Sequence, residues 1–396
     1  MIYNSFQGLE LSALGFGAMR LPLLESGEID VRQTEEMVRY AMEHGVNYFD
    51  TAYPYHNGQS EPVLGAALKQ YPRESFYLAS KFPGHQIASV YDPEAVFEHQ
   101  LKKCQVEYFD FYLLHNVNES SIGVYQDPQW GILDYFLEQK RLGRIRHLGF
   151  STHGEVANMK EFLDWCGDKM EFCQIQLNYL DWTLQDAKAK CELLKERNIP
   201  IWVMEPVRGG ALAALAPEAE ETLGALRPDE SMAAWALRWL QTVPETTVVL
   251  SGMSNMEQMA ENVAVYENEK PLNEAELAAV EKIAHSMLND IPCTACRYCC
   301  DGCPMELDIP MLLNTYNNLR ISKSINMAIR IENLPEEKRP GACIGCGACE
   351  AICPQKIEIP KLLGELQTTW EAMPKWADMC REREKAILDL RAGRIQ

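Results

Sequence analysis

The chain has 396 residues, of which 47% are apolar and 24% are charged, a balance typical of a globular protein with about two or three domains. Its formal net charge is −20, which argues against a nucleic-acid-binding protein, because such proteins need basic surfaces for phosphates. The sequence shows neither a secretory leader nor an apolar run long enough to cross a membrane, so we expect a cytoplasmic protein.

Short apolar runs and longer amphipathic segments alternate over the first 290 residues. A hairpin is expected first, at Tyr3–Phe6 and Leu9–Ser12. Eight further strands are expected at Leu14–Gly17, Val46–Phe49, Phe76–Ser80, Phe109–Leu114, Ile145–Phe150, Cys173–Leu177, Ile199–Met204 and Thr246–Leu250. Helices are expected between them, as at Val31–His44, Asp92–Gln105 and Leu184–Arg197, and a further helix over Asn273–Leu288 ends this part. The alternation predicts an α/β fold of the (β/α)8 TIM-barrel type, and the lack of GxGxxG after the first barrel strand weakens the rival doubly wound sheet.

The C-terminal part is rich in cysteine, since ten of the 14 cysteines follow residue 290. Two runs share the spacing C-x2-C-x2-C-x3-C-P, and they are Cys293, Cys296, Cys299, Cys303 and Cys343, Cys346, Cys349, Cys353. This is the bacterial ferredoxin spacing for [4Fe–4S] clusters, in which the first three thiolates bind one cluster and the fourth reaches the other. Zinc is the alternative, but four-cysteine zinc sites usually split their ligands into two CxxC pairs.

We therefore predict two [4Fe–4S] clusters with crossed ligands. One is expected on Cys293, Cys296, Cys299 and Cys353, and the other on Cys343, Cys346, Cys349 and Cys303. Cys300 and Cys380 do not fit the spacing and are interpreted as non-ligands, and a helix is expected over Asn314–Ile331 between the runs. The predicted organisation is a barrel domain over 1–288, a mainly helical ferredoxin-like domain over 289–361 and a helical extension over 362–396.

Four polar side chains lie at the ends of three consecutive predicted strands: Asp50, Tyr55, Lys81 and His115. The C-terminal ends of barrel strands share one rim, so these groups are expected to converge there. A phenol can then act as an acid, because a nearby ammonium lowers its ordinary pKa of about 10. Asp50 would hold Lys81, and His115 would orient the substrate oxygen. A lone lysine or histidine at a strand end is more often structural, so the prediction depends on the joint spacing.

These motifs resemble those of the aldo-keto reductase family. The similar segments are Leu14–Met19 (LGFGAM), Asp50–Glu61 (DTAYPYHNGQSE), Lys81, Leu113–His115 (LLH) and Gly149–Ser151 (GFS), in order over roughly residues 1–285. The resemblance implies a (β/α)8 barrel in which hydride passes between a nicotinamide and a carbonyl. It also implies that Asp50, Tyr55, Lys81 and His115 form a catalytic tetrad, with Tyr55 as the general acid.

The same resemblance implies a set of cofactor-binding residues. They are Ser151 and Gln174 at the carboxamide, Met204 at the nicotinamide ring, Pro206, Arg208 and Gly209 at the pyrophosphate, Gly252 and Ser254 at the adenosine phosphate, and Glu261 and Asn262 at the adenine. Thr152 stands where the family usually has asparagine. Gly252 and Gln258 replace two basic residues of NADPH-specific members, which weakens an NADPH assignment and leaves NADH, weak dinucleotide binding or another redox cofactor open.

Hydride transfer moves two electrons, whereas a cluster passes one at a time, so three functions stay open. The favoured one is an NAD(P)H-dependent reductase of small carbonyl substrates, or the reverse alcohol oxidation, with clusters for structure, regulation or electron transfer. The second takes electrons from an external ferredoxin or similar carrier into a barrel that uses flavin or direct cluster electrons, although no feature singles out flavin. The third is an electron-carrier subunit with a silent barrel, against which the complete tetrad argues. Trp370 and Trp376 in the extension suit packing within the chain or against a second subunit.

Overall fold

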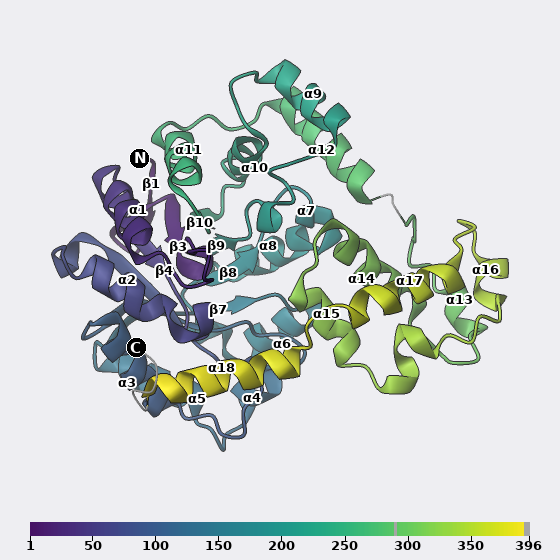
Figure 1. Cartoon of the computed structure of the whole chain (residues 1–396), viewed down its shortest axis with the longest axis horizontal. Helices are drawn as coiled ribbons and strands as arrows, with labels where there is room; N and C mark the ends of the chain where they lie inside the picture. Colours follow the sequence, from purple (N-terminus) through teal and green to yellow (C-terminus); the bar gives the residue numbers. More distant parts are fainter. Residues whose placement is uncertain (289–290, 392–396) are drawn as a thin grey trace. The chain divides into compact units, whose positions relative to one another are not determined.

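The computed structural model describes residues 1–288 and 291–391, which form two compact units. The first unit comprises Met1–Leu277 and the residues from Glu382 onward, and the second comprises Ala278–Arg381 (Figure 1). The expected boundary after residue 288 adjoins positions 289–290, and the end of the expected extension, 392–396, also lies outside the described residues. Within the described ranges, no helix is both long and apolar enough to cross a membrane.

Eight parallel strands close into a barrel in the order β10-β3-β4-β5-β6-β7-β8-β9. They are β3 (Leu14–Gly17), β4 (Tyr48–Asp50), β5 (Tyr77–Phe82), β6 (Phe109–Leu114), β7 (Ile145–Thr152), β8 (Cys173–Gln176), β9 (Ile201–Met204) and β10 (Thr246–Ser251). The predicted barrel is confirmed. The observed strands differ from the predicted ones by at most about two residues at either end, which is the usual uncertainty of strand limits.

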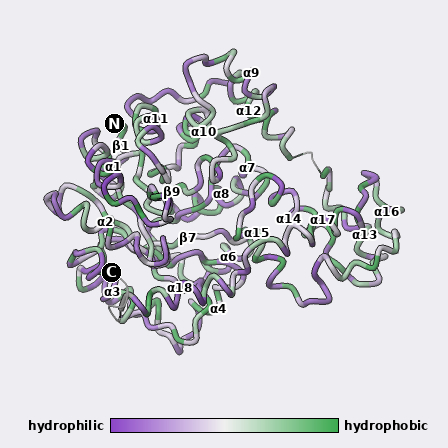
Figure 2. Tube along the Cα trace, viewed as in Figure 1, coloured by the Kyte–Doolittle hydropathy of each residue, from purple (hydrophilic) through white to green (hydrophobic). Residues whose placement is uncertain are grey.

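Helices connect successive strands and surround the barrel (Figure 1). They are α1 (Val31–Glu43), α2 (Ser60–Leu68), α3 (Pro93–Cys104), α4 (Ile122–Gln126), α5 (Ile132–Arg141), α6 (Val156–Cys166), α7 (Asp181–Leu184), α8 (Ala187–Glu196), α9 (Pro217–Leu226), α10 (Met232–Leu240) and α11 (Met256–Glu267). Helix α1 shows why they form: Thr34, Met37, Val38 and Ala41 are buried at helical spacing. Figure 2 shows the same alternation of hydrophilic and hydrophobic residues along the helical segments. The side chain of Asp92 caps α3 by accepting a hydrogen bond from Ala95 N, ahead of Pro93 in the first turn.

The predicted hairpin, β1 (Tyr3–Phe6) and β2 (Leu9–Ser12), closes the end of the barrel where the strands begin. Phe6 and Leu11 are buried in a cluster with inward-facing residues of five strands. The ring of Phe6 lies 5.7 Å from that of Phe111 and 5.1 Å from that of Trp202, between centroids. Because apolar side chains fill this end, the polar groups of the barrel gather at the opposite rim.

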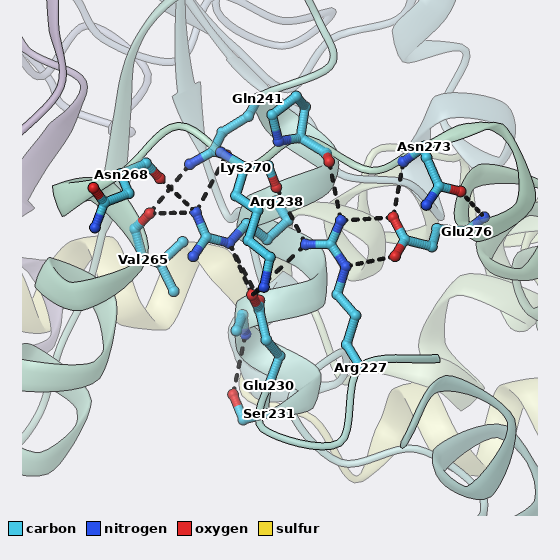
Figure 3. Close-up of polar contacts among 12 residues, drawn as sticks. Arg227, Glu230, Ser231, Arg238, Gln241, Val265, Asn268, Lys270, Asn273 and Glu276 are labelled. Carbon is cyan, nitrogen blue, oxygen red and sulfur yellow. Dashed lines mark hydrogen bonds and ion pairs between the residues drawn. The ribbon is translucent and has the colours of Figure 1, made fainter. Parts of the chain in front are cut away.

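Charged side chains tie together the outer helices on one side of the barrel unit (Figure 3). Arg227 donates two hydrogen bonds to Glu276, from Nε at 2.7 Å and from Nη2 at 2.6 Å. Arg238 donates to the carbonyl oxygens of Val265 and Asn268, at 2.6 and 2.7 Å. These contacts join α10 and the segment before it to the end of α11 and to the start of α12 (Glu274–Leu288).

The second unit contains helices only, among the residues that the structure describes. After α12, they are α13 (Tyr298–Asp301), α14 (Ile309–Ile321), α15 (Ile325–Glu332), α16 (Ala348–Ile352), α17 (Ile359–Glu371) and the first part of α18 (Trp376–Arg391), besides short 3₁₀ turns. They enclose a separate apolar core that includes Leu312, Leu366 and Trp370, so Trp370 packs within its own unit.

The prediction of one helix over Asn314–Ile331 is wrong. The structure has two helices there, because Ser322 is extended, at φ −152° and ψ 133°, and ends α14. Serine competes for backbone hydrogen bonds and favours helix ends. Helix α14 also starts earlier than predicted, at Ile309, where the side chain of Asp308 accepts a hydrogen bond from Met311 N and Pro310 occupies the first turn.

Candidate functional site

Asp50, Tyr55, Lys81 and His115 converge at the rim where the barrel strands end. Lys81 Nζ lies 2.5 Å from Asp50 Oδ1, 2.7 Å from the carbonyl oxygen of Thr51 and 3.5 Å from the hydroxyl of Tyr55. The Tyr55 and His115 rings meet edge to face, 5.8 Å apart between centroids. Neighbouring strands set this geometry, since β4 ends at Asp50, β5 carries Lys81, and His115 directly follows β6.

Burial sets the charge state of this site. Burial favours the neutral amine of Lys81, but the Asp50 carboxylate and Tyr55 outweigh it and raise the lysine pKa. Burial likewise raises the pKa of Asp50, and Lys81 opposes that rise. For Tyr55, burial raises the pKa above its ordinary value although Lys81 pulls it down. The lysine therefore acts on the phenol in the expected direction, but the expected net lowering is not found, because desolvation is the larger effect.

The histidine of the tetrad, His115, has a second histidine as its neighbour. His85, four residues after Lys81, packs against His115 with 4.3 Å between ring centroids. Burial lowers the pKa of His115 well below its usual range, and His85 and Lys81 add to the effect. Burial also lowers the pKa of His85 to about 3, with the Arg383 guanidinium of α18 as the next cause. His115 is thus neutral at neutral pH and can donate a hydrogen bond without carrying charge.

The predicted nicotinamide positions lie on adjacent strands. Ser151 of β7 pairs in register with Gln174 of β8, and Met204 ends β9. Ser151 Oγ accepts a hydrogen bond from Asn116 N at 2.8 Å. The side-chain oxygen of Gln174 is buried without a hydrogen-bond partner. An orphaned amide oxygen at this rim fits the carboxamide of a nicotinamide, whose N–H groups it can accept.

The predicted phosphate loops follow β9 and β10. Arg208 is 1% exposed and points inward, where its Nη1 lies 2.7 Å from Asp181 Oδ1. Gly209 and Gly210 follow with positive φ angles of 63° and 99°, and Pro206 is buried before them. Arg208 therefore shapes this loop from inside, an orientation that its position in the sequence does not reveal.

The loop after β10 is held by its own polar groups. Gln258 Oε1 accepts a hydrogen bond from Ser254 N at 2.8 Å, and Asn262 Nδ2 donates to Ser251 Oγ at 2.9 Å. Gly252 lies under the side chain of Arg20, and Glu261 is half-buried on α11. Gln258, which the resemblance places where NADPH-specific members have a basic residue, thus contacts the backbone of its own loop.

The eight cysteines of the two runs line two pockets in the second unit. Cys293, Cys296, Cys299 and Cys353 line one, and Cys303, Cys343, Cys346 and Cys349 line the other. These are the two crossed sets expected from the ferredoxin spacing. Cys300 is not among the residues that line either pocket. Over residues 1–288 and 291–391, no three His, Cys, Asp or Glu side chains converge as around one metal ion, and a [4Fe–4S] cluster needs no such convergence, since each thiolate binds a different iron.

The two cysteine runs share their backbone geometry. Ala295 and Gly345 have φ angles of 53° and 67°, and Arg297 and Gly347 have φ angles of 64° and 75°. After the fourth cysteines, Glu306 and Lys356 repeat the pattern at 52° and 53°. The left-handed residues within the two-residue spacers turn the loop between two cysteines, which explains how such short spacers direct three thiols into one pocket.

Sequence reasoning missed several residues of the rim. His85 offered a usable signal, because it follows a strand that carries a predicted tetrad residue. Asp181 offered none, since its pairing with Arg208 depends on the loop conformation. Arg20 directly follows the LGFGAM motif, and this position is the only signal that the sequence offered for it.

Comparisons with known proteins agree with this geometry. Residues 13–285 match the model of the aldo/keto reductase family, and residues 292–358 match the 4Fe-4S dicluster domain. Uncharacterized oxidoreductase YqkF of Bacillus subtilis is 26% identical over 69% of this chain and 92% of its own length. NADH-specific methylglyoxal reductase of Escherichia coli is 23% identical over 60% and 84%. A match to probable aldo-keto reductase 1 of Glycine max, 34% identical, covers 37% of this chain and 42% of that protein.

Solved structures show the same fold. Aldo-keto reductase AKR11C1 from Bacillus halodurans, in its holo form, superposes with a TM-score of 0.57 at 27% identity, over 72% of this chain and 96% of that one. The thermostable aldo-keto reductase Tm1743 gives a TM-score of 0.59 at 22% identity, over 72% and 100%, which supports the fold alone. The chain is therefore an oxidoreductase that belongs to the aldo/keto reductase family and carries a C-terminal 4Fe-4S dicluster domain.

Proposed function

We propose that the barrel reduces a small carbonyl compound, or oxidises the matching alcohol, with a nicotinamide dinucleotide, and that the eight cysteines of the two runs hold two [4Fe–4S] clusters. The observation that carries the first part is the contact of Lys81 Nζ with both Asp50 Oδ1 and the Tyr55 hydroxyl in a buried site. A tyrosine beside a buried ammonium is a suitable proton donor, because the ammonium stabilises the phenolate that remains after proton transfer.

Each residue has a distinct task in this proposal. The nicotinamide, when bound, supplies the hydride. Tyr55 gives its proton to the carbonyl oxygen as that oxygen gains negative charge, and Lys81 stabilises the phenolate that remains. Asp50 holds Lys81 in place and balances its charge. Neutral His115 donates a hydrogen bond that orients the carbonyl oxygen towards Tyr55.

The nicotinamide part is tested by anaerobic assay of the cluster-loaded protein with NADH or NADPH and a panel of aldehydes. The Tyr55→Phe variant should lower turnover by about 100-fold or more, the usual contribution of a general acid. Tyr53→Phe is the matched control, because Tyr53 is a nearby buried tyrosine whose hydroxyl contacts His99 rather than Lys81. Unchanged turnover of every accepted aldehyde in Tyr55→Phe would rule out this mechanism.

A second candidate is electron transfer from an external carrier through the clusters. It is favoured by one observation, that Cys296 and Cys346, one from each pocket, are exposed. An exposed ligand brings a cluster within reach of a carrier such as a ferredoxin. This function predicts turnover driven by reduced ferredoxin without nicotinamide, and visible spectra of anaerobically purified protein would reveal a flavin.

A further inference from the structure

The positive charge expected at the pyrophosphate loop is not free to meet a ligand. Asp181 Oδ2 accepts hydrogen bonds from Gln176 Nε2 and Asn178 Nδ2, both at 2.7 Å, and its other oxygen holds Arg208. Both partners of the Arg208–Asp181 pair are almost fully buried. Pulling Arg208 outward would leave a buried carboxylate unpaired, which is costly.

Another arginine reaches this loop from a different strand. Arg20 ends the short turn after β3 and is exposed. Its stem runs over Gly252, since a Cβ on that glycine would lie 3.3 Å from Arg20 Cβ and 3.4 Å from its Cδ. Its Nη2 lies 3.3 Å from where a Cβ on Gly209 would stand. The Arg20 side chain thus spans the two predicted phosphate loops.

The backbone holds Arg20 in this place. Ser254 Oγ donates a hydrogen bond to the carbonyl oxygen of Arg20 at 3.0 Å, which fixes the residue to the loop after β10. Both loops present glycines towards its side chain, and a Cβ on Gly210 would meet nothing within 4 Å. Bare backbone beside a guanidinium suits a diphosphate, because the anion can approach the chain closely while the guanidinium donates two parallel hydrogen bonds.

One acidic group belongs to the same surroundings. The pKa of Glu205 is raised to about 6, because burial and, next, Asp181 raise it by more than Arg208 and Arg20 lower it. The exposed guanidinium of Arg20 is therefore close enough to the Glu205 carboxyl group to lower its pKa. Its neighbour Glu205 lies directly before Pro206, at the start of the loop that a diphosphate would approach.

We propose that Arg20, and not Arg208, is the cationic contact of the dinucleotide diphosphate, which it holds across Gly209 and Gly252. This inference rests on the proposed use of a nicotinamide dinucleotide. Because NADH and NADPH share the diphosphate, Arg20 contributes equally to the binding of both. Any discrimination between NADH and NADPH must therefore come from residues other than Arg20.

The test is anaerobic titration calorimetry of the cluster-loaded protein with NAD⁺, NADP⁺ and ADP-ribose, which bind without turnover. Arg20→Met should weaken all three by about 10- to 100-fold, the usual worth of a hydrogen bond to a charged group. Arg20→Lys should keep part of the affinity, since it keeps the charge but loses the paired donors. Arg39→Met is the control, because Arg39 is an exposed arginine on α1 whose partner is Glu43.

The outcomes separate this inference from the function on which it rests. Unchanged affinity in Arg20→Met, with normal binding by the wild type, overturns the role of Arg20 alone. A loss confined to NADP⁺ also overturns it, because that result would place Arg20 at the 2′-phosphate. A wild-type protein that binds none of the three ligands overturns the nicotinamide proposal and this inference together.

Discussion

The barrel site and the cysteine pockets are built in opposite ways. In the barrel, Lys81 and Asp50 are 0% and 3% exposed, and each satisfies the charge of the other. In the second unit, the pocket thiols range from buried to exposed, and four of the loop residues that aim them have left-handed φ angles. The barrel rim is thus preorganised by its own hydrogen bonds. The pocket thiols would instead be held in place by bonds to the irons of the two proposed clusters.

This contrast predicts that losing a cluster ligand has the largest structural effect. Cys349→Ala should lower the iron content of the anaerobically reconstituted protein from about eight to about four atoms per chain, because one of two [4Fe–4S] clusters loses a ligand. Helix content of the second unit should fall with it, since metal binding and folding are coupled. Iron analysis and far-UV circular dichroism provide the measurement.

Cys300→Ala is the matched control, because Cys300 adjoins Cys299 but lines neither cysteine pocket. It should keep the full iron content. Equal iron loss in both variants would show that the crossed ligand sets are assigned incorrectly.

In the barrel, removing one partner of the buried pair should cost stability. Lys81→Met leaves the Asp50 carboxylate buried without its cation, and such a change typically costs about 3–5 kcal/mol. The double variant Asp50→Asn/Lys81→Met should lose less, because no charge is then stranded. Urea denaturation of the cluster-loaded variants measures both, and equal losses in the single and double variants would contradict the pairing.

The same variant has a defined pH dependence. Lys81 opposes the rise that burial causes in the pKa of Asp50, so Lys81→Met should raise that pKa further. A carboxyl group whose pKa is higher in the folded than in the unfolded state binds more protons when folded. The variant should therefore be least destabilised in acid, and it should lose stability as the pH rises through the folded pKa.

The smallest expected effect concerns the two cysteine loops. Gly345→Ala puts a side chain at φ 67° and should cost about 1–2 kcal/mol. This corresponds to a fall of about 4–15 °C in the melting temperature of the second unit. Ala295→Gly, at the equivalent position of the other run, should have a smaller effect in the opposite direction. Gly302→Ala is the control, since Gly302 has a φ of −99° and a Cβ there would meet open space.

The sequence predicts the barrel well because its signals are local. Strands β3 and β6 match their predicted limits, and the tetrad converges because strand ends share one rim. The break between α14 and α15 was missed because the apolar pattern continues on both sides of Ser322. The inward turn of Arg208 was missed for a different reason, because it depends on a carboxylate 27 residues earlier in the chain. Long-range pairings of this kind leave no periodic trace in a sequence.

The path of the chain through the two units has a consequence for the surroundings of the barrel rim. Residues 382–391 belong to the barrel unit, although they follow the whole second unit in the sequence. The barrel unit is therefore built from two stretches of sequence, one before and one after the second unit. Arg383, whose charge influences His85 and His115, lies in the second of these stretches. The electrostatic surroundings of the rim histidines therefore depend on a residue that follows both cysteine runs in the sequence.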